Sequence, residues 1–97
     1  MSDNEVASGV TVMIPEPLRA YTDGQAEVSV QAGTVGDVLY ELVSHYEEIG
    51  KRIIGESGGL RHGVIVAVNG QDIRFAGHLQ APVRPGEQVQ IVVTMLV

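Results

Sequence analysis

Alternation between apolar and polar residues predicts strands at several places along this chain of 97 residues. In VTVMI, for example, Val10, Val12 and Ile14 alternate with Thr11 and Met13, which is the period of a strand with one covered face. The final stretch, VQIVVTMLV, is largely apolar, which is typical of a covered central strand. The predicted strands are residues 10–14, 26–32, 64–68, 71–75 and 89–97.

A change of period after Thr34 predicts one amphipathic helix. Apolar residues recur there at helical spacing and would form one buried stripe, which consists of Val35, Leu39, Leu42, Tyr46 and Ile49. Thr34 and Asp37 resemble a capping box at the start of this helix. Gly50 is expected to end it.

Turn and loop signals separate these elements. Pro15 ends the first strand, because a proline ring cannot donate to a ladder. Asp23-Gly24 and Asn69-Gly70 each predict a tight turn. Residues 55–63, GESGGLRHG, are expected to form a flexible connector, since they lack the spacing and the strand-to-helix context of a phosphate-binding loop. Residues 76–88 are expected to be irregular.

The order of the predicted elements favours an α+β fold, with one mixed sheet and one main helix on one of its faces. In this interpretation residues 9–97 form a single domain and residues 1–8 are a flexible lead-in. The last strand is expected at the centre of the sheet, beside the first. Ladders on both sides would then hold an apolar chain end that would otherwise fray.

The composition argues against several classes of function. Twelve Asp and Glu stand against six Lys and Arg, whereas nucleic acids and anionic membranes are bound through basic surfaces. The chain contains no cysteine, which excludes disulfides and thiol chemistry. Its first residues lack the pattern of a signal peptide, and its longest apolar run is too short to span a bilayer. A soluble, cytoplasmic protein is therefore expected.

No group of side chains predicts a catalytic or metal centre. His45 is expected on the outer side of the helix, beside Glu41 and Glu48. His62 and His78 fall in loops far apart in the sequence. Zinc sites need closely spaced pairs of ligands, which this sequence does not contain. We therefore expect no enzymatic activity, no metal and no cofactor.

The sheet face turned away from the helix is the candidate binding surface. One set of alternating residues would pack on the helix, and the other set would point outward on neighbouring strands. A contiguous apolar patch on a monomer commonly marks a binding surface. The predicted partner-binding residues are Met13, Ile65, Ala67, Val92 and Thr94, and the patch would be extended by Met95 and Leu96.

Segments spread over most of the chain carry a resemblance to a known family. They are VTVMIPEPLRAYTDGQAEVSV, TVGDVLYELVSHY, VIVAVNGQDIRF and RPGEQVQIV, between Val10 and Ile91. In this order and spacing they resemble the ubiquitin-like sulfur carriers of the MoaD/ThiS family, in particular the carrier that supplies sulfur for cysteine biosynthesis in actinobacteria. The resemblance implies a β-grasp fold, in which the predicted strands have the order 2-1-5-3-4.

The resemblance also implies a function. In such carriers a partner enzyme adenylates the C-terminal carboxylate with ATP, sulfur then displaces AMP, and the thiocarboxylate donates its sulfur to an acceptor. The carrier is a cosubstrate and not an enzyme. The implied partners are an E1-like adenylyl- and sulfurtransferase and a sulfur-accepting synthase, in a pathway of the cysteine, molybdopterin or thiamine type.

The last residues depart from the family pattern. Carriers end in Gly-Gly, because glycine has no Cβ to crowd a narrow channel, whereas this sequence ends in TMLV. Three interpretations stay open. Glycines follow Val97 in the native chain, or the protein is a carrier-like interaction module without tail chemistry, or a different terminus is used. If Val97 is the native end, its carboxylate is the candidate reactive group. The predicted apolar patch on the sheet also permits self-association of the protein.

Overall fold

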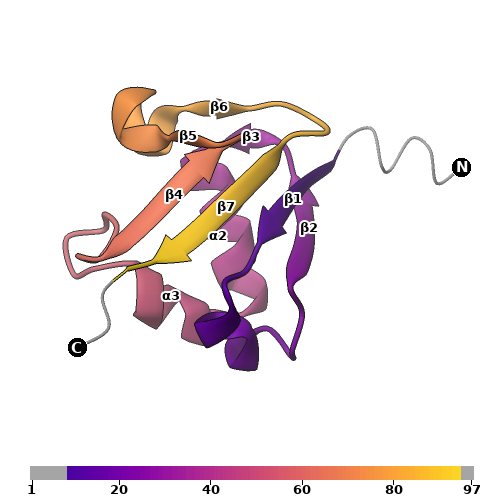
Figure 1. Cartoon of the computed structure of the whole chain (residues 1–97), viewed down its shortest axis with the longest axis vertical. Coiled ribbons are helices and arrows are strands. Elements are labelled where there is room, and N and C mark those ends of the chain that lie inside the picture. The colour runs from indigo at the N-terminus through magenta and orange to yellow at the C-terminus, as the bar shows by residue number, and fades with distance from the viewer. Residues whose placement is uncertain (1–8, 95–97) are drawn as a thin grey trace, which may run out of the picture.

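A mixed sheet of five strands forms the framework of the structure (Figure 1). The structure is a computed structural model that describes residues 9–94. The strands pair in the order β2-β1-β7-β4-β5, with β1 parallel to β7 and the other neighbours antiparallel. They are β1 (Gly9–Met13), β2 (Glu27–Gln31), β4 (Val64–Val68), β5 (Gln71–Asp72) and β7 (Gln88–Val93).

β7 lies at the centre of the sheet, beside the first strand, as predicted. Val89 pairs with Val12 of β1, and Ile91 pairs with Val66 of β4. These side chains belong to the core and are at most 2% exposed. The predicted continuation over residues 95–97 and the predicted lead-in over residues 1–8 lie outside the described residues.

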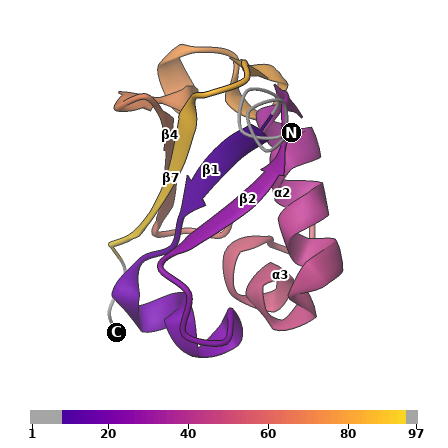
Figure 2. The ribbon, with the colours of Figure 1, turned by 90° about the vertical axis from the view of Figure 1, so that its right-hand side faces the viewer.

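The helices lie on one face of the sheet, which Figure 2 shows edge-on. α2 (Val35–His45) buries Val35, Val38, Leu39 and Leu42 against it. The predicted capping box is confirmed. Thr34 Oγ1 accepts a hydrogen bond from the Asp37 amide at 3.1 Å, and the Asp37 carboxylate accepts one from the Thr34 amide at 3.0 Å.

The predicted single helix is wrong in its second half. α2 ends at His45, Tyr46 leaves the helical region with φ −135° and ψ 82°, and α3 (Glu47–Ile53) follows in a new direction. Gly50, which was expected to end the helix, lies inside α3. A Cβ added at Gly50 would lie 2.8 Å from Cγ1 of Val43 in α2. Glycine is therefore used at this position for the close approach of two helices.

Short elements are found where the sequence predicted a longer strand and an irregular region. The strand expected over 71–75 is limited to β5, because η2 (Ile73–Phe75), a 3₁₀ turn, follows with its start capped by the Asp72 carboxylate. The region 76–88, expected to be irregular, contains η3 (His78–Gln80) and β6 (Pro82–Val83). β6 pairs with β3 (Gly33–Thr34) in a separate ladder of two strands. This pairing brings the chain after η3 to the start of α2.

The connections between the strands follow the turn signals. Asp23 and Gly24 have φ values of 56° and 80°, and Asn69 and Gly70 have values of 50° and 86°. Both pairs adopt the left-handed conformation that tight turns require. The turn at Asp23 is preceded by a 3₁₀ helix, η1 (Glu16–Tyr21), which the sequence pattern did not predict. Within residues 9–94, no helix is long and apolar enough to cross a membrane.

Gly50→Ala should lower the free energy of unfolding by about 1 kcal/mol, because the new methyl group overpacks the contact with Val43. In a Val43→Ala background the clashing atoms are gone. The same change at Gly50 should then raise the free energy of unfolding by up to about 1 kcal/mol, since alanine favours a helix over glycine. Urea denaturation of the four proteins in this cycle measures both effects. A stabilised Gly50→Ala single variant would contradict the packing argument.

Candidate functional site

The sheet face turned away from α2 and α3 carries the predicted binding residues. Met13 of β1, Ile65 of β4 and Val92 of β7 are half-buried there, and Thr94 is exposed just after β7. Ile65 and Val92 are directly opposite each other in the β4–β7 ladder. These two side chains therefore form the centre of the apolar surface on this face.

The apolar patch is narrower than predicted, because the strand register places Gln90 inside it. Gln90 pairs with Met13 on one side and with Ala67 on the other. Ala67 also faces Asp72 of β5 and is only 9% exposed. Ala67 lies on the predicted face, but its short side chain offers little surface to a partner. The term apolar face is used below for Met13, Ile65 and Val92.

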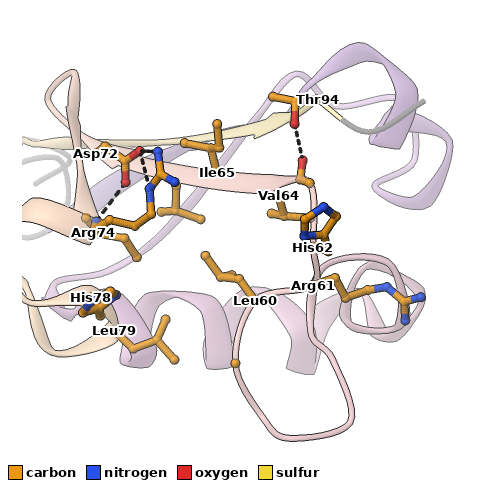
Figure 3. A pocket seen from close by; sticks show the side chains of 14 residues that line it. Leu60, Arg61, His62, Val64, Ile65, Asp72, Arg74, His78, Leu79 and Thr94 are labelled. Atoms are coloured by element: carbon orange, nitrogen blue, oxygen red, sulfur yellow. Dashed lines mark hydrogen bonds and ion pairs between the residues drawn. The ribbon is translucent and has the colours of Figure 1, made fainter. Parts of the chain in front are cut away.

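Thr94 anchors the chain where it leaves the sheet. Its amide donates to the Gly63 carbonyl at 2.7 Å. Its hydroxyl donates to the same oxygen at 3.0 Å (Figure 3). Gly63 immediately precedes β4, so the two bonds hold the end of β7 against the start of β4. Met95, Leu96 and Val97, predicted to extend the patch and to carry the carboxylate, lie outside the described residues.

A pocket of about 560 Å³ opens beside this exit point, between β4, the loop of residues 59–63 and the 3₁₀ turns η2 and η3. Leu60 projects towards its middle, and Leu79 lies at its η3 end (Figure 3). His62 and His78, from loops that were treated as unrelated in the sequence, both line it. Three distant segments build this pocket, so no local pattern in the sequence indicated it. We call it the edge pocket.

An ion pair closes one end of the edge pocket (Figure 3). Arg74 donates to the Asp72 carboxylate from Nη2 at 2.8 Å and from Nε at 3.0 Å, and the Arg74 amide donates to the same group at 2.8 Å. The side-chain bonds from Arg74, followed by its amide bond, hold the pKa of Asp72 below its ordinary value. The same pairing raises the pKa of Arg74.

The comparison with protein families agrees with the fold and with the central position of β7. The sequence model of the ThiS family matches residues 12–95. The chain belongs to the ThiS family. The sulfur carrier protein CysO of Mycobacterium tuberculosis is 39% identical to it over 84 residues, which is 84% of this ThiS-family chain and 90% of CysO. CysO of Mycobacterium bovis shows the same identity and coverage. The predicted family is therefore confirmed.

Solved structures confirm the β-grasp fold of this ThiS-family chain. The crystal structure of Mycobacterium tuberculosis CysO superimposes with a TM-score of 0.82 and 38% identity, and the match covers 89% of this chain and 99% of that one. The Amycolatopsis orientalis BexX/CysO complex gives a TM-score of 0.83 at 33% identity, over 91% and 98% of the two chains. The ThiS-family chain is thus homologous to a sulfur carrier along nearly its whole described length.

Arg74→Gln should raise the pKa of Asp72 towards its ordinary value, because the donors that favour the carboxylate are removed. A carboxyl whose pKa is lowered by folding stabilises the native state above its ordinary pKa, and loses this effect as the pH falls through the lowered value. The stability advantage of the wild type over Arg74→Gln should therefore shrink in acid. NMR titration of the Asp72 carboxyl carbon in both proteins measures the shift. An equal titration midpoint in the two would contradict this assignment.

Proposed function

We propose that this protein acts as a sulfur carrier, a cosubstrate whose C-terminal carboxylate is converted to a thiocarboxylate. The observation that carries the proposal is the 39% identity, over 84% of the chain, to proteins named sulfur carrier protein CysO. The central position of β7 supports it, because the last described residue, Thr94, follows this strand beside the apolar face.

The chemistry uses the main-chain terminus and no side chain of the described residues. The carboxylate oxygen attacks the α-phosphorus of ATP, and pyrophosphate leaves. A sulfur nucleophile then attacks the carbonyl carbon of the acyl adenylate, and AMP leaves with the electron pair of the broken C–O bond. The carrier contributes a rigid support and an accessible carbonyl. It is not a catalyst.

Two partners follow from this chemistry. An E1-like adenylyl- and sulfurtransferase loads the carrier, and a synthase accepts the sulfur. The Amycolatopsis orientalis CysO was crystallised in a complex with BexX, which supports docking of such carriers onto partner proteins. The apolar face, with Thr94 and the following Met95 and Leu96, is the proposed contact region for both partners. The cytoplasm, where ATP is available, is the proposed location.

Conversion of the C-terminal carboxylate to a thiocarboxylate is tested with two forms of the protein. One form ends at Val97, and the other is extended beyond it by Gly-Gly. Each is incubated with ATP, a sulfur donor and the E1-like enzyme of the same genome, and its intact mass is measured. The extended form should gain the mass difference between sulfur and oxygen. The form ending at Val97 should not, because a β-branched residue crowds the carboxylate.

The outcomes of this experiment separate the two functional hypotheses. If neither form gains sulfur while both bind the enzyme, the carrier proposal fails and the interaction module without tail chemistry replaces it. Reading the gene beyond the codon for Val97 shows which of the two forms is native.

Val92→Glu should weaken binding to the activating enzyme by about tenfold or more, because it places a charge at the centre of the apolar face. Ser29→Glu is the matched control, since Ser29 is exposed on the same face at the β2 edge, opposite Thr11. Calorimetric titration measures both affinities, and circular dichroism checks that both variants fold. Equal affinities for the two variants would show that the partner docks elsewhere.

A further inference from the structure

The turn between β4 and β5 consists of Asn69 and Gly70, a dipeptide that the proposed carrier function does not use. An asparagine side chain can react with the amide nitrogen of the next residue, and a glycine there leaves the approach open because it has no Cβ. Gly70 has φ 86°, and a Cβ built on it would meet no atom of residues 9–94 within 4 Å. Both residues are exposed. The two reacting groups are therefore adjacent, accessible to water and uncrowded.

Two hydrogen bonds hold the amide group of the Asn69 side chain. Its Nδ2 donates to Oε2 of Glu87 at 3.0 Å, and its Oδ1 accepts from the Gln88 amide at 3.1 Å. Glu87 is half-buried and is itself fixed, because its Oε1 accepts from the Arg84 amide at 2.8 Å. We call this pair of bonds from Asn69 to Glu87 and Gln88 the turn clamp. Rotation of the side chain towards the amide nitrogen of Gly70 requires the turn clamp to open.

We propose that Asn69 is a site of deamidation, and that the turn clamp sets the rate of this modification. The amide nitrogen of Gly70 gives its proton to hydroxide and attacks Cγ of Asn69. A carbon–nitrogen bond forms and closes a succinimide ring, the bond from Cγ to Nδ2 breaks, and the leaving nitrogen takes a proton from water and departs as ammonia. Water then opens the ring at either carbonyl, which gives aspartate or isoaspartate. Water is the only co-reactant consumed.

The product disturbs the entry into the central strand. Aspartate at this position lacks the Nδ2 donor and places a second carboxylate beside that of Glu87, where like charges repel. Isoaspartate also lengthens the main chain of the turn by a carbon. The Asn69 amide donates to the Gln88 carbonyl at 3.0 Å, so a displaced turn also loosens the first residue of β7. This modification involves no sulfur chemistry, so it stands or falls independently of the proposed carrier function.

The reaction is followed in the whole protein, kept in mildly alkaline buffer, by peptide mapping with mass spectrometry. Glu87→Ala should deamidate at Asn69 about tenfold faster than the wild type, because the side chain is then free to rotate. Glu56→Ala removes the same charge from an exposed site in the loop of residues 55–63 and should stay within about twofold of the wild type. Asn4, which precedes Glu5, is the internal reference and should react equally in all three proteins.

Circular dichroism checks that both variants fold. Equal rates at Asn69 in Glu87→Ala and Glu56→Ala would overturn the protective role of the turn clamp. Absence of aspartate and isoaspartate at Asn69 in all three proteins would overturn the assignment of the site.

The effect of the product is tested without waiting for the reaction. Asn69→Asp should lower the urea concentration at the midpoint of unfolding, because the new carboxylate lies beside that of Glu87. In a Glu87→Gln background the neighbouring group is uncharged and can donate a hydrogen bond, so most of the loss should be recovered. An equal loss in both backgrounds would overturn the predicted repulsion.

Discussion

The pairing of β7 between β1 and β4 is the constraint on which the rest of the structure depends. It joins the two ends of the described chain in a parallel ladder and connects them to β4 in an antiparallel one. Val89 and Ile91 are almost fully buried as a result. Contacts so distant in sequence are entropically costly to form, and burial of aliphatic side chains under α2 and α3 offsets that cost.

The two-residue period of β7 divides its side chains between stability and binding. Val89 and Ile91 point into the core, whereas Gln90 and Val92 point to the opposite face. The strand is held rigidly by ladders on both sides, and Thr94 adds two further bonds to Gly63. The main chain therefore leaves the sheet from a fixed position after Val93.

The sequence predicted those elements whose signal is a local cap or a repeated spacing of apolar residues. Alternation predicted β1, β2, β4 and β7, and the spacing of apolar residues predicted α2 with its Thr34–Asp37 cap. The break at Tyr46 was missed because the apolar stripe continues through it into α3, so the period gives no sign of a change in direction. β3 and β6 are too short to show a period, and they are held by tertiary contact.

The candidate site was predictable only in part for a related reason. Alternation correctly gave the direction of Met13, Ile65 and Val92, but the insertion of Gln90 between Met13 and Ala67 depends on the register between strands. A parallel register has no hairpin turn to define it, so it could not be read from the sequence. The edge pocket needs β4, η2, η3 and the loop of residues 59–63 to meet, and no single segment carries its pattern.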